Sequence, residues 1–289
     1  MSTRPNDSPP RVAFQGERGA FSEEAAVKLL GERATLVPRP TFESLFAATA
    51  EGAADLALAP VENTLAGSVH RVYDLLLDSP LHVTAEVVIP IRHFLIGCPG
   101  ASLEGVRTVE SHPVALAQCE RFFASRPDIR RTAAEDTAGS VAEVLRRGDP
   151  TRAAVAGRRA AEIYGGHVLR AGLEDHAENY TRFLLLAPAP AAADAADKLS
   201  LVIKLAHRPG ALHHALEPFA RRRIDLLKIE SRPLRGSPWE YHFYLDLRAS
   251  PLDAEADAAL AELRGRAASV RVLGYYPSFR KDEGEVLSD

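Results

Sequence analysis

Short apolar segments alternate with amphipathic helical patterns along most of this chain, and this alternation constrains the fold more than any other feature. Alternating strands and helices are typical of α/β proteins, in which helices cover a sheet. The pattern occurs twice before residue 187, so we expect two lobes. Strands or β-rich segments are predicted at residues 12–14, 35–38, 56–59, 83–90, 91–97, 106–109, 129–132, 153–156 and 180–186. Helices are predicted at residues 22–30, 42–51, 65–77, 114–123 and 137–145.

An alanine- and proline-rich stretch at residues 187–197 indicates a linker. Beyond it the order becomes βαββαβ, which predicts a ferredoxin-like domain. Its strands are expected at 199–205, 224–232, 239–247 and 270–276, and its helices at 209–222, with Pro209 at the start, and 253–264. The expected domains are a tail (1–10), an α/β domain (11–187; lobes 11–97 with 166–187, and 98–165), a linker (188–197), the βαββαβ domain (198–280) and a second tail (281–289).

Composition excludes several classes of protein. The 289 residues carry 35 Lys and Arg against 39 Asp and Glu, so no broad basic surface for nucleic acid is predicted. Cys98 and Cys119 form neither a disulfide framework nor a zinc pattern, and Cys119 is expected to be a buried thiol. The polar start of the chain and the absence of any long apolar run predict a cytoplasmic protein with no membrane partner.

Polar residues stand at the ends of three predicted strands. Asn179-Tyr180-Thr181-Arg182-Phe183 directly precedes an apolar run, Glu62-Asn63-Thr64 follows the strand at 56–59, and Ser111-His112-Pro113 follows the strand at 106–109. Ligands of open α/β sheets bind in crevices at strand ends. We therefore expect hydroxyls, amides and a cation to converge on one crevice that suits a small anion.

Taken in order, these segments resemble prephenate dehydratase. The resemblance is carried by G-x-x-G-x-F-S at 16–22, P-V-E-N-T-x-x-G-S-V at 60–69, S-H-P-x-A-L-A-Q-C at 111–119 and N-x-T-R-F at 179–183. Near the C-terminus, Gly210-Ala211-Leu212 and Glu230-Ser231-Arg232-Pro233 resemble the phenylalanine-binding ACT domain. The resemblance covers roughly residues 11 to 280. It implies a two-lobed periplasmic-binding-protein-like catalytic domain followed by a ferredoxin-like ACT domain.

The resemblance also implies a reaction. Prephenate loses its ring carboxylate as CO2 and its ring hydroxyl as water, and yields phenylpyruvate for phenylalanine biosynthesis without a cofactor or metal. Thr181 is implied as the donor to the departing hydroxyl, although its residue type also fits a strand end satisfied by the backbone. Arg182 suits a carboxylate, but neighbours in a strand point to opposite faces, so it binds substrate or organises the site. Asn179 donates to a carboxylate or fixes the turn.

The remaining expected contacts come from all three strand ends and the first loop. Asn63 and Thr64 are predicted to cap a helix start whose amides attract an anion. Glu62 is either protonated or paired with a cation, and His112 is either cationic or structural. Val114 stands where the family usually has Gln, which removes one polar contact. The expected substrate-binding residues are Ser22 (also the expected N-cap), Glu62, Asn63, Thr64, Gly67, Ser68, Ser111, His112 and Phe183, the last chiefly a core residue.

The ACT resemblance implies feedback inhibition by phenylalanine in a homodimer or homotetramer. The implied effector residues are Gly210, Ala211, Leu212, Glu230, Ser231, Arg232 and Pro233, although Glu230 and Arg232 also fit an ordinary ion pair. Other hypotheses remain open. The enzyme can act on arogenate instead, the two-lobed protein can be an amino-acid sensor without catalysis, or the chain can be the dehydratase unit of a bifunctional mutase-dehydratase. The short polar N-terminus argues against the last.

Overall fold

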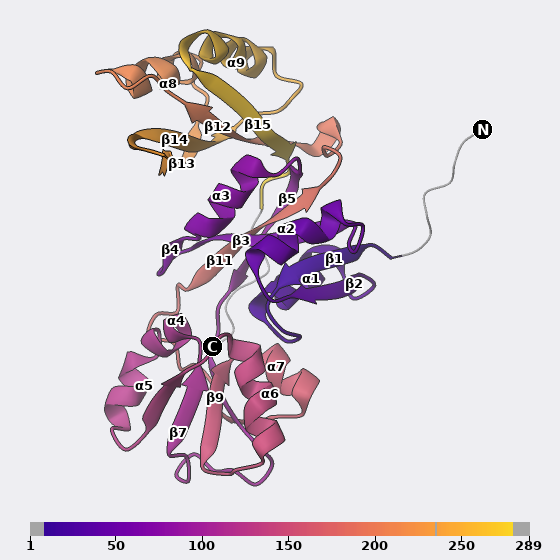
Figure 1. Ribbon diagram of the computed structural model, residues 1–289, viewed down its shortest axis with the longest axis vertical. Helices are drawn as coiled ribbons and strands as arrows, with labels where there is room; N and C mark the ends of the chain where they lie inside the picture. Colours follow the sequence, from indigo (N-terminus) through magenta and orange to yellow (C-terminus); the bar gives the residue numbers. More distant parts are fainter. Residues whose placement is uncertain (1–8, 235, 280–289) are drawn as a thin grey trace, which may run out of the picture. The chain divides into compact units, whose positions relative to one another are not determined.

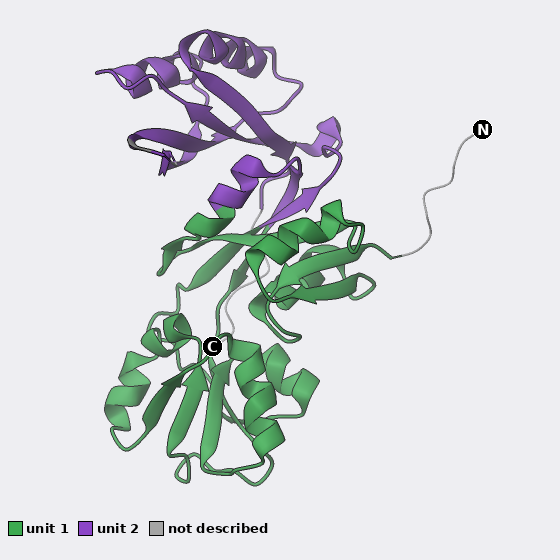
Figure 2. Ribbon diagram, in the orientation of Figure 1, with its two compact units in different colours: residues 1–72, 87–183 green, residues 73–86, 184–289 purple. Residues whose placement is uncertain are grey.

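A computed structural model describes residues 9–234 and 236–279, so most of the two expected tails lies outside the described residues. The chain divides into two compact units, one of residues 1–72 and 87–183 and one of residues 73–86 and 184–289 (Figure 2). Residues 73–86 and 184–187 of the expected domain 11–187 fall in the second unit.

The first lobe of unit 1 contains a sheet of order β2-β1-β3-β11-β5, with the short strand β4 beside β3 (Figure 1). Val12, Ala13 and Phe14 of β1 have no exposed surface, as expected for a central parallel strand covered on both faces. The boundary between the units passes through β5, β11 and α3. The strands are β1 (Arg11–Gln15), β2 (Thr35–Arg39), β3 (Leu56–Asn63), β4 (Gly67–Ser68), β5 (His82–Pro90) and β11 (Tyr180–Ala187), and the helices are α1 (Phe21–Leu30), α2 (Phe42–Ala50) and α3 (His70–Asp78).

The second lobe has a sheet of order β10-β6-β9-β7-β8 with helices on both faces (Figure 1). Alternate residues of β9 pack on opposite sides. Ala153 and Val155 lie in the core under α4 and α5, whereas Ala154 and Ala156 lie in the core under α6 and α7. The elements are β6 (Phe94–Gly97), β7 (Thr108–Ser111), α4 (Pro113–Ala117), α5 (Glu120–Ser125), β8 (Arg130–Ala133), α6 (Thr137–Arg147), β9 (Arg152–Ala156), α7 (Arg158–Tyr164) and β10 (His167–Arg170).

This sheet corrects two expectations. Strands β6 and β10 belong to the second lobe, because both sit in its sheet rather than in the sheet of the first lobe. The single helix predicted at 114–123 is two helices that break at Cys119. The carboxylate of Asp175 accepts hydrogen bonds from the backbone N–H groups of Glu120 and Arg121, so a distant residue caps the second helix. Cys119 is buried as predicted, and burial raises the pKa of its thiol.

The turn after β3 also differs from the prediction. The strand continues to Asn63, β4 follows at Gly67, and α3 begins only at His70. Asn63 Oδ1 accepts from the N–H groups of Leu65 and Ala66 at 3.0 and 2.8 Å, which closes a tight turn instead of capping a helix. Gly67 has a φ of 82°, which lets the chain reverse there. The expected anion site at a helix start beside Asn63 is therefore absent from this described turn.

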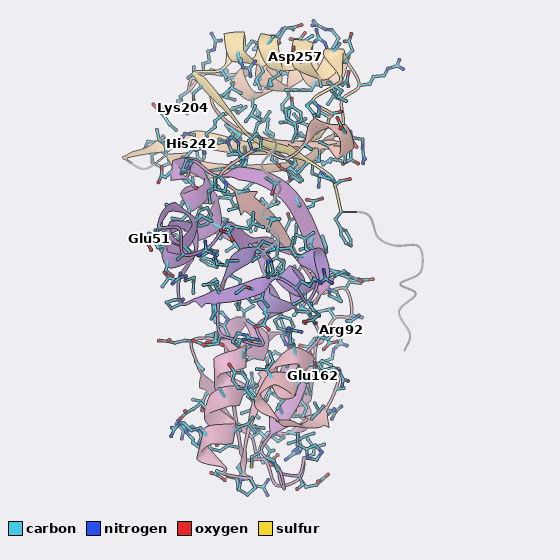
Figure 3. The ribbon with its side chains drawn as sticks, turned by 90° about the vertical axis from the view of Figure 1, so that its right-hand side faces the viewer. Glu51, Arg92, Glu162, Lys204, His242 and Asp257 are labelled. Atoms are coloured by element: carbon cyan, nitrogen blue, oxygen red, sulfur yellow. The ribbon has the colours of Figure 1, made fainter. Side chains whose placement is uncertain are left out.

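The second unit contains the predicted βαββαβ domain, with a sheet of order β13-β14-β12-β15 covered by α8 and α9. Helix α8 begins at Ala211 after Gly210, not at Pro209, because Gly210 takes the left-handed conformation with φ 78°. Lys204 and His242 are register partners on β12 and β14, and both are labelled in Figure 3. The elements are β12 (Lys198–Lys204), α8 (Ala211–Arg221), β13 (Leu226–Leu234), β14 (Ser237–Arg248), α9 (Ala254–Arg266) and β15 (Ser269–Tyr276), preceded by the 3-10 turn η1 (Ala193–Ala195).

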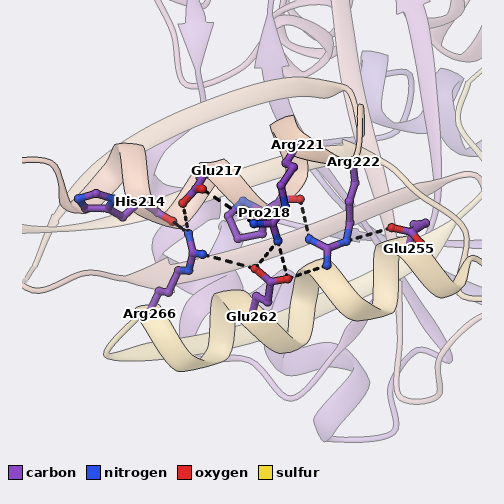
Figure 4. A network of polar contacts seen from close by, with 8 residues as sticks. All are labelled: His214, Glu217, Pro218, Arg221, Arg222, Glu255, Glu262 and Arg266. Atoms are coloured by element: carbon purple, nitrogen blue, oxygen red, sulfur yellow. Dashed lines mark hydrogen bonds and ion pairs between the residues drawn. The ribbon is translucent and has the colours of Figure 1, made fainter.

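A network of ion pairs ties α8 to α9 (Figure 4). Glu262 of α9 accepts from Arg221 and Arg222 at 2.7 and 2.6 Å, and Arg266 reaches back to Glu217 at 2.5 Å. Arg221 and Arg222, at the C-terminal end of α8, are thus held in ion pairs with α9. Within this unit, segment 73–86 is held by side chains of the βαββαβ domain. Tyr244 donates to the Tyr73 carbonyl at 2.7 Å, and Lys198 pairs with Glu86 at 2.6 Å.

Candidate active site

Unit 1 encloses a cleft of about 430 Å³ whose walls come from both lobes. The first lobe contributes the loop before α1, the start of that helix and the ends of β3 and β11. The second lobe contributes the starts of α4 and α6. Among the polar lining residues are Gln15, Ser22, Asn63, His93, His112, Gln118, Glu135, Asp136, Thr137 and Thr181. This volume suits a ligand of one six-membered ring with short substituents.

Two of the three predicted strand ends meet at this cleft through side-chain contacts. Asn63 Nδ2 lies 2.9 Å from Thr181 Oγ1 and 2.8 Å from Asn179 Oδ1. Asn179 Nδ2 in turn donates to Gln118 Oε1 at 2.9 Å, which connects the first lobe to the second. Asn179 has no exposed surface, so its role is to connect these groups beneath the cleft.

Arg182 lies on the other face of β11. Thr181 lines the cleft and Arg182 is not a lining residue, which follows from the alternation of side chains along a strand. The guanidinium Nη1 lies 3.5 Å from Glu62 Oε2, and the Arg182 side chain is only 13% exposed. Of the two roles left open by the sequence, this position favours organising the site. Glu62 is therefore paired with a cation, which was one of the two alternatives expected for it.

Several other predicted contacts lie away from the lining. Ser111 is fully buried and donates to the Val155 carbonyl at 2.6 Å. Thr64 donates to the Glu178 carbonyl at 2.7 Å and accepts from the Tyr180 N–H, so its hydroxyl holds the two segments together. Gly67 and Ser68 form β4 and are likewise outside the lining. Ser22, His112 and Phe183 do line the cleft, together with Asn63 and Thr181.

His112 acts as the N-cap of α4. Its Nδ1 accepts from the Val114 N–H at 3.2 Å, which requires that nitrogen to be unprotonated. The contact gives His112 a structural role as the cap of this helix. Val114 lines the cleft and is 43% exposed. Its apolar side chain offers no hydrogen bond to a ligand at this place, where the family usually has Gln.

The N-terminus of α1 opens into the cleft. Its N-cap is Ala20, not Ser22, and alanine has no side chain that can accept from the first helical N–H groups. Phe21 and Ser22 line the cleft at this point. The first-turn residue Glu23 is fully buried, and it accepts from Arg18 at 2.8 Å and from Arg159 of α7 at 2.9 Å. With that charge paired, the start of the helix retains its partial positive charge toward the cleft.

Gln118 and His93 are two of several lining residues that were not proposed from the sequence. Gln118 was visible in the motif at 111–119, but nothing in its spacing indicated that it meets Asn179. His93 follows β5 by three residues and gave no sequence signal. Its ring is 1% exposed, its Nε2 lies 2.9 Å from Gln118 Oε1, and burial lowers the pKa of its imidazole. Within residues 9–234 and 236–279, no group of three or more His, Cys, Asp or Glu could hold a metal ion.

A second, smaller cavity of about 140 Å³ lies in the βαββαβ domain. It is lined by the predicted effector residues Ala211 and Leu212, by Arg208 and Glu240, and by apolar residues that follow β12 or lie on β14. The segment Glu230–Pro233 is outside this lining. Arg232 instead pairs with Asp74 of α3 within the same unit, at 3.2 Å. One copy of the chain thus has Ala211 and Leu212 at this cavity and Glu230–Pro233 outside it. Among the described residues, no helix is long and apolar enough to cross a membrane.

These features define a class: a two-lobed α/β protein with a cleft of hydroxyl and amide donors, followed by a ferredoxin-like domain. The chain belongs to the prephenate dehydratase family, whose sequence profile matches residues 12–191, and it is a carbon–oxygen lyase of the hydro-lyase type. It is 42% identical over 283 residues to arogenate dehydratase/prephenate dehydratase 2 of Arabidopsis thaliana, which covers 94% of this chain and 74% of that protein.

Two solved structures show the same architecture. Prephenate dehydratase of Arthrobacter aurescens in complex with L-Phe is 30% identical, with a TM-score of 0.84 over 92% of this chain and 89% of that chain. A protein described as GqqA, a quorum quenching acylase, is 32% identical, with a TM-score of 0.85 over 93% of this chain and 98% of that chain. Both agree with the two-lobed fold followed by a βαββαβ domain.

Proposed function

We propose that this enzyme converts prephenate to phenylpyruvate and is feedback-regulated by phenylalanine. The observation that carries the proposal is the position of Thr181 Oγ1, which lines the cleft and accepts from Asn63 at 2.9 Å. Because the oxygen accepts from Asn63, its own hydrogen is free to donate to a ligand.

The elimination needs such a donor. The electrons of the bond between the ring and its carboxylate move into the ring as CO2 leaves, and the bond to the ring hydroxyl breaks. The departing oxygen gathers negative charge, takes up one proton that comes from the solvent, and leaves as water. A hydrogen-bond donor held at this oxygen in a site with little water stabilises the developing charge. Thr181 supplies the donor, and aromatisation of the ring supplies the driving force.

The substrate carboxylates need a different part of the cleft. No lining residue is Lys or Arg, and the whole lining is within the described residues. The start of α1, with Phe21 and Ser22 in the lining and no side-chain cap, is the group best suited to one carboxylate. The Gln118 amide is suited to donate to the substrate from the opposite lobe. Ser22 therefore remains a proposed substrate contact.

A specific observation also favours arogenate as a second candidate substrate. Arogenate carries an ammonium group where prephenate carries a keto oxygen. Glu135 and Asp136 line the cleft, and a carboxylate there can accept from an ammonium group. Asp136 Oδ1 already accepts from the Gly139 N–H at 2.6 Å as the N-cap of α6, which leaves Glu135 as the better partner.

The decisive experiment supplies prephenate and arogenate separately at equal concentration to the purified full chain. Phenylpyruvate is followed by its ultraviolet absorbance, and phenylalanine by chromatography. We expect turnover of prephenate, with arogenate accepted at a rate that falls in Glu135→Gln. If the protein turned over neither substrate, the proposal would be refuted. The hypothesis of a sensor without catalysis would then be favoured.

The regulatory part of the proposal rests on the smaller cavity. Arg208 and the start of α8 can hold the carboxylate of an amino acid, and Glu240 offers a carboxylate for its ammonium group, although Glu240 also pairs with Lys204 at 2.8 Å. Since Glu230–Pro233 lies outside this cavity, we propose that a second copy of the chain supplies that segment. Phenylalanine titrated into an activity assay and into a light-scattering measurement should lower turnover and change the assembly. A response in neither would refute this part.

A further inference from the structure

The hydrogen bonds under the cleft converge on Gln118 Oε1, and two backbone N–H groups fix which side-chain atoms donate and which accept. Backbone N–H groups can only donate, so the Asn63 atom that faces Leu65 and Ala66 must be its oxygen. The other end of the Asn63 amide is therefore nitrogen, and its two hydrogens are shared among Asn179 Oδ1, Thr181 Oγ1 and the Tyr180 carbonyl. This assignment does not depend on how any amide is oriented by convention.

The hydrogen bond between Asn179 and Gln118 connects this network to the second lobe, and its donor can be assigned in the same way. Asn179 uses its oxygen to accept from Asn63, so its nitrogen faces Gln118. The Gln118 atom that meets it must be oxygen. That oxygen also lies 2.9 Å from His93 Nε2, and two acceptors would repel at this distance. His93 Nε2 must therefore carry a hydrogen and donate it.

The other ring nitrogen of His93 is isolated. Nδ1 is buried and has no hydrogen-bond partner among the described residues. A proton on it would place a charged N–H group in a buried site without an acceptor, and burial lowers the pKa of this imidazole. The Phe21 ring packs edge-on at 5.7 Å between centroids and helps to hold the imidazole in place. The resting ring is neutral, with its hydrogen on Nε2.

We propose that His93 is a positioning residue: its neutral Nε2–H form donates to Gln118 Oε1 and, together with Asn179, directs the Gln118 N–H2 at the substrate beside Thr181. With Oε1 held by two donors, the Gln118 amide cannot rotate without placing its nitrogen against two N–H groups. Its Nε2 has no partner within the described part of the chain, and Gln118 lines the cleft. The inference rests on the proposed function for the role of Thr181, but the form of the imidazole does not.

Two substitutions separate positioning from mere packing. Gln places an amide nitrogen where His93 Nε2 stands, whereas Asn reaches only the position of Nδ1. His93→Asn should lower kcat by about 10- to 100-fold, the size expected when one partner of a buried hydrogen bond is removed, and His93→Gln should restore most of it. Thermal unfolding of both variants serves as the stability control. Equal losses in the two variants, or none in His93→Asn, would overturn the proposal.

A second measurement uses the unaltered protein and does not require turnover. Nitrogen-15 chemical shifts of the imidazole distinguish the two neutral forms and the cation. We expect His93 to show a protonated Nε2 and an unprotonated Nδ1 at neutral pH. A hydrogen on Nδ1 would refute the hydrogen-bond direction even if the enzyme turns over prephenate. If the protein shows the expected shifts but is inactive on both substrates, the assigned hydrogen-bond direction stands and only the proposed reaction is refuted.

Discussion

Asn63 donates to Thr181 across 2.9 Å although the two residues are 118 positions apart in sequence. Asn63 is the last residue of β3 and Thr181 the second residue of β11, and these strands are neighbours in the first sheet. Thr181 Oγ1 accepts this hydrogen bond through a lone pair, so the hydrogen of the hydroxyl is left to donate to a ligand. The catalytic proposal depends on this direction.

Replacing Thr181 tests the donor itself. Thr181→Val keeps the shape but removes the hydroxyl, and we expect kcat to fall by about 100- to 1000-fold, the loss typical of removing one donor to developing charge. Thr181→Ser keeps the hydroxyl and should retain most of the activity. Steady-state kinetics with thermal unfolding as a control will separate the two. A Thr181→Val enzyme with near-normal kcat would remove Thr181 from the mechanism.

Asn63→Asp tests the hydrogen-bond direction by changing a single functional group. The carboxylate can still accept from Leu65 and Ala66, so the turn should survive. It cannot donate to Thr181, whose hydroxyl would then turn and donate to the carboxylate. We expect kcat to fall by about 100-fold and folding stability to fall as well, because the Asn179 oxygen and the Tyr180 carbonyl also lose their donor. If Asn63→Asp kept full activity, the hydroxyl would not need the direction that we assign.

A double-mutant cycle on Glu62 and Arg182 tests whether the arginine organises the site. The two side chains approach to 3.5 Å, so urea unfolding of the single and double variants to Gln should give a coupling of about 1 kcal/mol. Arg182→Lys should also impair the enzyme, since a point charge does not replace the planar guanidinium. An increase in KM for Arg182→Gln that persists in the Glu62→Gln background would instead indicate direct substrate contact.

The stability of the protein should depend on pH through His93. Burial lowers its pKa in the folded protein, with Glu174 opposing the shift, while the unfolded chain titrates near the ordinary value of about 6.5. The unfolded state therefore binds more protons as pH falls below that value, and the free energy of unfolding decreases. His93→Gln has no imidazole at this position and therefore lacks this pH-dependent loss of stability. The difference in the free energy of unfolding between the wild type and His93→Gln should shrink or reverse between pH 7 and about pH 5. Parallel pH curves would contradict the burial of a neutral ring.

Gly210→Ala tests the effector cavity. Gly210 has a φ of 78°, which an alanine adopts only at a cost of about 1 kcal/mol or more, so the start of α8 should shift. We expect a weaker response to phenylalanine with unchanged basal turnover. Gly265→Ala is the matched control. It lies in α9 with no atom within 4 Å of the added methyl group, and it should leave the response intact. Equal responses in both variants would argue against this cavity as the effector site.

Local sequence patterns were sufficient where burial is local. The βαββαβ order and most strand positions followed from apolar periodicity, because each strand buries its own side chains. Predictions failed where a distant residue sets the local structure. The Asp175 carboxylate divides the helix at Cys119, and the turn after Asn63 is held in part by Tyr180, whose carbonyl accepts from the Thr64 N–H at 2.9 Å.

The candidate site divides in the same way. The residue types of the polar strand ends were visible in the sequence, and they indicated a crevice for a small anion. Which of them face it was decided only by folding. Alternation along β11 directs Thr181 to the cleft and Arg182 away from it, and Ser111 is buried against Val155. His93 joined the site because the turn after β5 brings its imidazole to Gln118. A sequence specifies which hydrogen-bonding groups exist, whereas their direction depends on partners that only the tertiary structure brings within reach.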